Sequence, residues 1–226
     1  MIQFKNVLNK SILILQIFYS YCFGLKNSAK ETTPDLLIIK IDKQKMKQCK
    51  SEENNQMIRL FDDVKDPDFT RSAIEDIEDS TFEDLERAVF LGLTFNRLKR
   101  LRKEMFKGLG HLFILTLSQN QIKQIDDDAF DCMPKMNKLF LDGNRIEQLR
   151  PAMFSKLTNL EVLYLMECNI DFSSAHFDKK TFTVIKNLGE LDLSKNRIKS
   201  IDWEMFDGLD KLQFLKLNEN MIEELC

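Results

Sequence analysis

The chain has only two histidines, His111 and His176, among its 226 residues. Neither lies at a metal-ligand spacing from a cysteine or from the other histidine. The sequence also lacks GxSxG, HExxH and CxxC motifs and a glycine-rich phosphate loop. We therefore expect no enzyme activity, no metal site and no cofactor, and we interpret both histidines as solvated surface residues.

Long apolar runs are also scarce, and the only one covers residues 12–24. It follows Lys5 and Lys10 and ends at the small residue Gly24, as secretory signal peptides do. We predict a signal peptide over residues 1–24, cleaved after Gly24. A start-transfer anchor is the alternative, but the run is too short to span a bilayer. We expect a secreted, extracellular protein without a transmembrane segment.

An excess of positive charge is missing as well. Removal of the signal peptide takes two of the 33 basic residues and none of the 36 acidic ones, so the formal charge changes from −3 to about −5. We therefore do not expect a nucleic acid partner. The only N-x-S/T sequon begins at Asn9, within the signal, so the mature chain should carry no N-linked sugar.

What the sequence does have is a repeat. An asparagine recurs three residues after the leucine that ends an alternating Leu-x-Leu pair, and in one unit Cys168 takes its place. The six positions are Asn96, Asn120, Asn144, Cys168, Asn196 and Asn220. They recur at a period of about 24 residues, and only the step from Cys168 to Asn196 is longer, by four. Alternation predicts a strand, and the short polar side chain can hydrogen-bond backbone groups where the chain turns. We therefore predict a ladder between stacked units.

A second series has the same steps, including the irregular one. It consists of Phe82, Phe106, Phe130, Phe154, Phe182 and Phe206. We predict that these rings form a column that fills the convex side of the core.

Together these positions match the pattern LxxLxLx(x)N/CxL, and the chain from Pro67 to Cys226 resembles extracellular leucine-rich repeat proteins. Secreted arthropod repeat proteins and receptor-ectodomain arrays carry similar units of about 24 residues. The resemblance implies an α/β solenoid with a curved parallel β-sheet on its concave face and an irregular or short helical convex face.

The resemblance also suggests a domain organisation. Residues 25–66 form an N-terminal flanking segment, in which Asp35–Ile41 is a candidate edge strand. Residues 67–87, with Ser72 in the asparagine position, resemble a capping repeat. Residues 88–226 contain six repeats, the last of them incomplete.

Charges follow the same period. Acidic residues between Ile74 and Glu86 have basic counterparts one period later, and these have acidic counterparts one repeat further on. We therefore expect Asp126, Asp127 and Asp128 to face cations of neighbouring repeats and to bind no calcium.

The predicted concave face carries an apolar patch over the first four repeats. Its members are Phe90, Phe95, Ile114, Phe140, Val162, Tyr164 and Met166. Such patches often mark interaction sites, although some of these rings, Phe90 and Phe95 above all, could fold against the core or the cap. The main hypothesis is a module that binds a protein ligand or another repeat chain, with innate immunity and matrix or cell-surface recognition as candidate roles.

Three features leave alternatives open. Cys49 and Cys226 lie at opposite ends of the array, so each could form an intermolecular disulfide or remain a free thiol. The last repeat leaves its core uncovered, which suggests dimerisation in a structural or assembly role, or a fragment of a longer receptor. The four extra residues of the long repeat, within 171–180, could form a binding loop, or Phe172 could complete the core.

Overall fold

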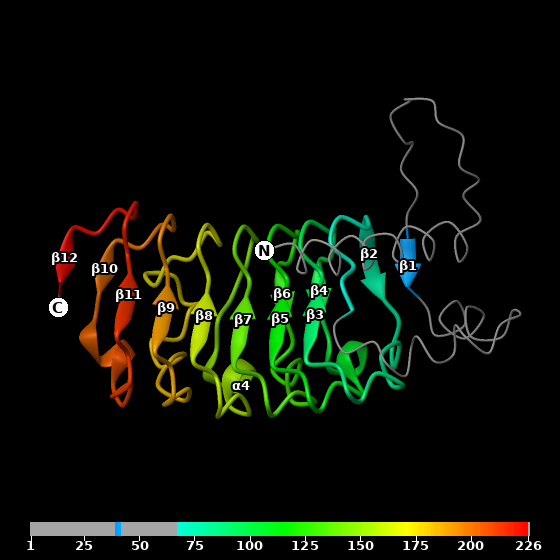
Figure 1. Cartoon of the computed structure of the whole chain (residues 1–226). Helices are drawn as coiled ribbons and strands as arrows, with labels where there is room; N and C mark the ends of the chain where they lie inside the picture. Colours follow the sequence, from blue (N-terminus) through cyan, green and yellow to red (C-terminus); the bar gives the residue numbers. More distant parts are fainter. Residues whose placement is uncertain (1–38, 42–66, 226) are drawn as a thin grey trace, which may run out of the picture.

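The computed structural model describes residues 39–41 and 67–225 of the chain. Repeating strand-and-turn units stand side by side along one axis (Figure 1). One strand from each unit joins a parallel sheet of six, in the order β11-β9-β8-β7-β5-β3. Its members are β3 (Phe90–Gly92), β5 (Ile114–Thr116), β7 (Lys138–Phe140), β8 (Val162–Tyr164), β9 (Glu190–Asp192) and β11 (Phe214–Lys216). The predicted solenoid is confirmed, and we call the solvent-facing side of this sheet the concave face.

Shorter parallel pairings run along the other side of the array. They involve β2 (Ile74–Ile77), β4 (Arg100–Leu101), β6 (Gln124–Ile125), β10 (Ser200–Ile201) and β12 (Glu224–Leu225). Strands β4 and β6 pair, as do β10 and β12, and β2 pairs with β1 (Ile39–Ile41). Single helical turns complete three of the units, namely η1 (Lys103–Phe106), α4 (Pro151–Phe154) and η2 (Trp203–Phe206).

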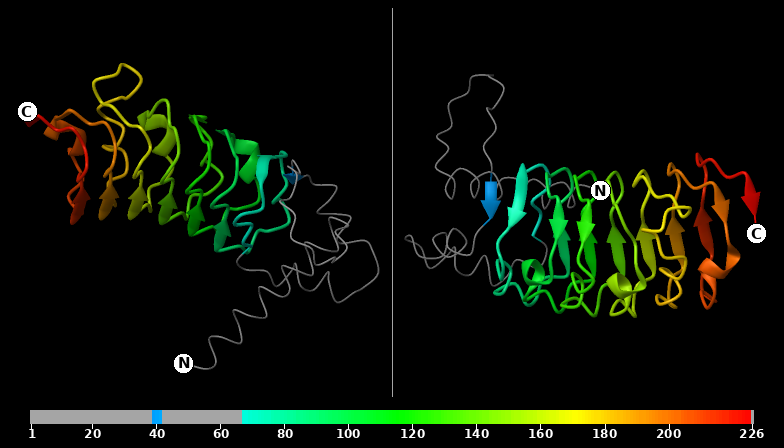
Figure 2. Two further views of the ribbon diagram at one scale, coloured as in Figure 1. Left: turned by 90° about the horizontal axis from the view of Figure 1, so that it is seen from above. Right: turned by 180° about the vertical axis from the view of Figure 1, so that it is seen from behind.

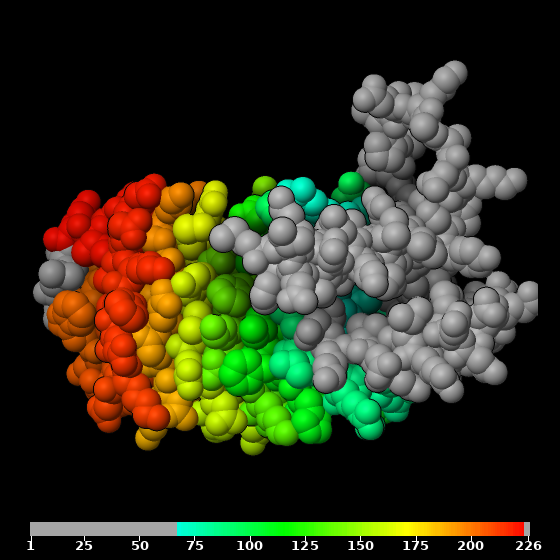
Figure 3. Space-filling view, in the orientation of Figure 1, coloured from blue at the N-terminus to red at the C-terminus, as the bar shows by residue number. Residues whose placement is uncertain are grey.

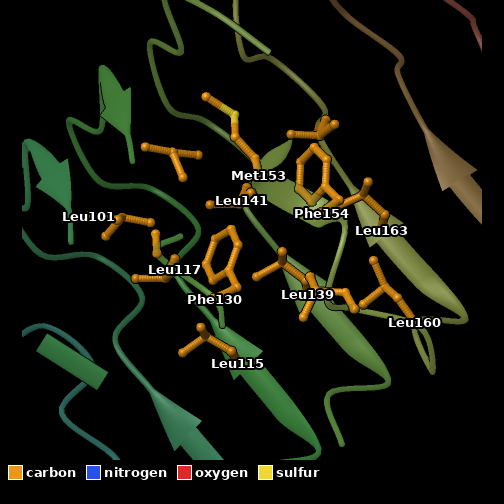
Figure 4. Packing of buried hydrophobic residues seen from close by; sticks show 14 of the residues in the cluster. Leu101, Leu115, Leu117, Phe130, Leu139, Leu141, Met153, Phe154, Leu160 and Leu163 are labelled. Atoms are coloured by element: carbon orange, nitrogen blue, oxygen red, sulfur yellow. The ribbon is translucent and has the colours of Figure 1, made fainter. Parts of the chain in front are cut away.

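The core lies between these two layers and is built by the periodic positions. The central leucine of each strand pairs in register with the equivalent leucine of the next, as Leu115 does with Leu139 and Leu139 with Leu163. Figure 4 shows these leucines packed against Phe130 and Phe154. Because each unit buries its apolar side only against its neighbours, stacking supplies the hydrophobic stabilisation of the array.

The phenylalanine series forms the predicted column. The ring centroids of Phe106 and Phe130 lie 6.5 Å apart, and those of Phe130 and Phe154 lie 6.3 Å apart, with the rings stacked. Phe182 and Phe206 continue it at 6.4 Å. The long repeat falls between Phe154 and Phe182.

The asparagine side chains join each unit to the one before it. Asn120 accepts a hydrogen bond from the backbone N–H of Leu98 at 3.1 Å, and donates to the carbonyls of Leu93 and Leu117 at 2.9 Å each. One amide therefore satisfies three backbone groups from two repeats. Asn96, Asn144, Asn196 and Asn220 make equivalent contacts.

Cys168 reproduces only part of this arrangement. Its thiol donates to the carbonyl of Leu141 at 3.2 Å. Burial raises the pKa of Cys168 to about 12, so the thiol keeps its proton. It offers no oxygen to the backbone N–H of Ile146, the group that an asparagine would reach, and no acceptor for that N–H occurs in the described part of the chain.

The residue before each ladder position adopts a left-handed conformation in all six repeats. It is a glycine, Gly143, in the third repeat, and in the other five it carries a Cβ. The five are Phe95, Gln119, Glu167, Lys195 and Glu219, with φ between 54° and 57°, and Gly143 has φ 66°. Side chains with a Cβ are strained in this conformation, so Gly143 is the one position of the series where the turn is unstrained.

The N-terminal end of the array is covered by the residues before β3. Asp68 forms a parallel bridge with Gly92, and the ring of Phe69 lies 6.2 Å from that of Phe82. Gly92 permits this approach, since a Cβ there would collide with the Asp68 carboxyl group. Strand β1 adds to β2 on the opposite side, with Ile39 paired with Ile74.

The extra residues of the long repeat form a loop that stands out from the convex side (yellow in Figure 2, left). Phe172 and Phe177 are buried at its base, and their rings meet edge to face at 6.2 Å. Phe172 also meets the ring of Phe182 edge to face, at 6.1 Å. Of the two interpretations left open by the sequence, the packing supports the one in which Phe172 completes the core.

Ion pairs connect neighbouring repeats on the outer surface. Each of the three consecutive aspartates faces a cation: Asp126 pairs with Arg100, Asp127 with Arg150 and Asp128 with Lys103. Lys107 and Glu83 pair at the predicted interval of one period, at 3.3 Å. Most other partners lie one or two residues away from that interval; Arg102, for example, contacts both Asp76 and Asp79. Long side chains reach diagonally, so the strict interval was wrong for these pairs although the charge matching between repeats is present.

Several sequence predictions concern residues outside the described part of the chain. They are the signal peptide at 1–24, most of the flanking segment at 25–66, Cys49 and Cys226. In the residues that are described, no helix has the length and apolar character needed to cross a bilayer.

Candidate interaction surface on the concave sheet

Two rows of side chains run across the concave face, because alternate residues of each strand point away from the core. The first row pairs Phe90, Ile114, Lys138, Val162, Glu190 and Phe214. The second row pairs Gly92, Thr116, Phe140, Tyr164, Asp192 and Lys216. The face therefore changes from mainly apolar residues at β3–β8 to mainly charged ones at β9 and β11. In the space-filling view the repeats form successive bands along the array (Figure 3).

The centre of this surface is an aromatic pair. Phe140 and Tyr164, neighbours in the second row, meet edge to face with ring centroids 5.1 Å apart. Ile114 and Val162 lie beside them in the first row, where Lys138 separates the two. All four apolar side chains are half-buried, so each keeps area for contact with another molecule.

The remaining members of the predicted patch lie around this centre. Phe90 pairs with Ile114 at the β3 end, and Met166 follows β8. Phe95 lies apart, in the turn before Asn96, where it is 48% exposed and the guanidinium of Arg71 lies 4.8 Å from its ring centroid. Phe95 is thus at the margin of the surface.

Val89 and Phe113 extend the apolar surface over the rim of the sheet, and the sequence reasoning missed both. They are 43% and 41% exposed and lie in adjacent repeats, with the Phe113 N–H donating to the Val89 carbonyl at 2.8 Å. Each directly precedes a strand, where the alternation of inward and outward side chains no longer applies. The signal was an apolar residue where the other repeats have Asn137, Glu161, Gly189 and Gln213.

A polar cluster adjoins the aromatic pair on its C-terminal side. The Tyr164 hydroxyl donates to Glu190 Oε1 at 2.7 Å, and Lys216 Nζ lies 2.8 Å from the same oxygen and 3.6 Å from Asp192 Oδ2. Hydrogen bonds from Lys216 and then Tyr164 lower the pKa of Glu190. The hydrogen bond to Glu190 raises the pKa of the Tyr164 hydroxyl. The cluster thus holds one cation against two carboxylates and a ring.

Asp142 lies just beyond the end of β7, two residues after Phe140, and its carboxyl group contacts no cation within the described residues. Its carboxyl accepts from the Met166 N–H at 3.0 Å and from the Ser118 hydroxyl at 3.2 Å. Burial raises the pKa of Asp142, and the like charge of Asp192 adds to this effect. Within the described residues no lysine, arginine or histidine forms an ion pair with it.

A second ladder runs along the rim where the chain enters the strands. Asn137 donates to the carbonyl of Asn159, Asn159 to that of Pro134, and Asn187 to that of Thr158. These bonds fix the segments that lead into β7, β8 and β9. The concave side chains between them are therefore held on a rigid support.

In the part of the chain that the structure describes, no group of three or more His, Cys, Asp or Glu residues is arranged to hold a metal ion. Cys132, on the convex side, and Cys168, in the ladder, are both free thiols.

Comparison with known proteins agrees with this architecture. A family model described as leucine rich repeat matches residues 89–146 and 175–222. The structure of a TLR13–ssRNA13 complex is similar, with a TM-score of 0.60 and 28% identity over 68% of this chain and 22% of that chain. The Toll–Spatzle complex of Drosophila, described as a molecular hub in development and innate immunity, has a TM-score of 0.58 and 26% identity, again over 68% and 22%. This chain therefore spans about a fifth of the length of either. No curated protein matches it.

Proposed function

This chain is a leucine-rich repeat protein, and on that premise we propose that it is a secreted recognition module that binds a protein partner through its concave face. The observation that carries the proposal is the half-buried aromatic pair Phe140 and Tyr164, held at the centre of the sheet with Ile114 and Val162 in the adjoining row. Aromatic side chains in such a position are the usual anchors of protein interfaces.

The rim supports a protein partner as well. Val89 and Phe113 continue the apolar surface past Phe90 and Ile114, so the face offers aliphatic and aromatic contact over several adjacent repeats. A monomeric protein seldom exposes a cluster of apolar side chains of this kind without use. The surface combines apolar contact area with a few fixed polar groups, which suits a folded protein or a peptide segment.

RNA is the alternative raised by the TLR13 complex, and the charges of the concave face disfavour it. The strand positions and the residues just after them hold two lysines, Lys138 and Lys216, against Asp142, Glu190 and Asp192. A polyanion needs clustered cations along its path. The complex between Toll and the protein Spatzle is the better guide, and it supports a role in innate immunity or development.

Secretion and domain organisation belong to the same proposal. The apolar run before Gly24 supports a signal peptide at 1–24. We assign residues 67–87 to an N-terminal cap, supported by the contacts of Asp68 with Gly92 and of Phe69 with Phe82.

A paired set of variants tests the proposal. Proteins that the full chain captures from extracellular fluid are compared with those captured by a Phe140→Ala/Tyr164→Ala variant. The control is Trp203→Ala, which removes an exposed aromatic ring, 52% accessible, from the convex side. We expect a partner that is retained by the wild type and the control and lost from the double variant. Equal capture by a double variant whose unfolding remains cooperative would place the binding site elsewhere.

A further inference from the structure

The concave face already binds one cation, and it comes from the chain itself. The ammonium group of Lys216 lies 4.8 Å from the ring centroid of Tyr164 and forms ion pairs with the carboxylates of Glu190 and Asp192. A ring flanked by carboxylates is a favourable environment for a lysine or arginine. Tyr164 therefore has a cation on its C-terminal side.

Just beyond the end of β7, a second carboxylate lacks such a partner among the described residues. Asp142 follows Phe140 by two residues, and its carboxyl group accepts from the backbone N–H of Met166, which in turn follows Tyr164 by two residues. The Met166 N–H and the Ser118 hydroxyl occupy one acceptor position on each carboxyl oxygen. An ionised carboxylate has about four such positions, so about two remain for a further donor.

Nearby cations of the chain are engaged elsewhere. Lys216 pairs with Glu190 and Asp192, and the charge of Lys138 acts on Glu190. Among the described residues, the negative charge of Asp142 therefore has no ion-pair partner. A charge in such a place costs solvation unless it is paired, and a binding partner can supply the pair.

We infer that the protein partner carries an arginine or lysine that pairs with Asp142, next to an apolar side chain that packs on Phe140 and Tyr164. The inference rests on the proposed function, since it assumes that the concave face is the binding surface, and it adds the chemistry of the segment that docks there. Arginine fits best, because its planar guanidinium can both donate two hydrogen bonds to a carboxylate and stack on an aromatic ring.

Selection of displayed peptides tests this directly and does not require the partner to be identified. A library of short random peptides is selected against the immobilised full-length protein, and the selected peptides are measured against three variants. Asp142→Asn keeps an acceptor for the Met166 N–H and removes only the charge. Asp210→Asn is the matched control, because it removes one exposed acidic charge away from the concave face. Phe140→Ala/Tyr164→Ala reports on the surface as a whole, and urea unfolding confirms that each variant is folded.

The expected result is enrichment of peptides with a basic residue beside an aromatic or aliphatic one. Their affinity should fall about tenfold or more with Asp142→Asn, as expected when a charge-assisted hydrogen bond is lost, and should be unchanged with Asp210→Asn. Peptides that depend on the aromatic pair but show no basic enrichment and no effect of Asp142→Asn would overturn the inference and leave the proposed function standing. Peptides that tolerate all three variants, or the absence of any enrichment, would count against both.

Discussion

The ammonium of Lys216 lies 4.8 Å from the ring centroid of Tyr164, although β9 separates their two strands. The link between them is Glu190, which accepts hydrogen bonds from both at 2.8 and 2.7 Å. Three adjacent strands are thus connected on the concave face by one set of polar contacts. The connection makes the stability of this region depend on the ionisation of Glu190.

We predict that acid weakens this connection. The pKa of Glu190 is lowered in the folded state, mainly by the hydrogen bond from Lys216, so its stabilising effect is complete above the unfolded value near 4.5. It is lost as the pH falls through the folded pKa. Glu190→Gln should therefore reduce the free energy of unfolding at pH 7 by less than about 1 kcal/mol, as for other exposed pairs. Urea unfolding over a series of decreasing pH values checks this, since the difference between the two proteins should shrink as Glu190 is protonated. A difference that stays constant over the whole series would mean that packing, not charge, is responsible.

The ladder asparagines should be far more costly to remove. Asn120→Ala leaves one N–H and two carbonyls without their side-chain partner in a buried position. Because unsatisfied buried groups cost about 1–3 kcal/mol each, partly recovered by water, we expect a loss of about 3 kcal/mol in the free energy of unfolding. Asn218→Ala, which truncates an exposed amide, is the control and should change little. Equal effects of the two would show that the ladder contributes no special stability.

The periodic positions were the part of the structure that sequence could predict. The repeat interval correctly placed the strands, the core leucines and the phenylalanine column, because each such position repeats the same environment. Interactions that do not repeat were missed. Asn159 and Asn187 share the 28-residue step of the long repeat, but Asn137 lies 22 residues before Asn159, so the rim ladder does not follow the period throughout.

The candidate site was predicted only in part, for a related reason. Alternation identified Phe140 and Tyr164 as outward-facing, but it could not show that Phe113 is exposed at the rim. The lack of a cation at Asp142 depends on where Lys216 points, across two strands. Side-chain direction of this kind is set by packing and is not encoded in the period.

The irregular ladder position offers a stabilising substitution. Cys168→Asn would supply the oxygen that the buried N–H of Ile146 lacks, while its amide could donate to Leu141 as the thiol does now. We expect the free energy of unfolding to rise by about 1 kcal/mol, the net value of one hydrogen bond. Cys168→Ala, which removes the donor and adds no acceptor, should lower it. If the asparagine variant is the less stable of the two, the long repeat must leave too little room for the larger side chain.

Gly143 should be sensitive to the addition of a single methyl group. Its φ of 66° disfavours a Cβ, and Gly143→Ala should lower the free energy of unfolding by about 1 kcal/mol. A Cβ at Gly110 would meet no atom within 4 Å outside its two chain neighbours, so Gly110→Ala is the matched control and should be nearly neutral. Thermal unfolding of both variants measures the difference. Equal melting temperatures would indicate that this turn accepts a Cβ in the left-handed conformation at no net cost.

The last prediction concerns the loop of the long repeat and tests whether Phe172 in this loop stabilises the core. Phe172 is buried and meets both Phe177 and Phe182 edge to face. Phe172→Ala should cost about 3–5 kcal/mol, as for other buried rings, and should break the continuity of the column next to Phe182. Truncation of the exposed His176 in the same loop, to alanine, should cost little. A Phe172→Ala protein with unchanged stability would instead assign the loop to the surface and reopen a binding role for it.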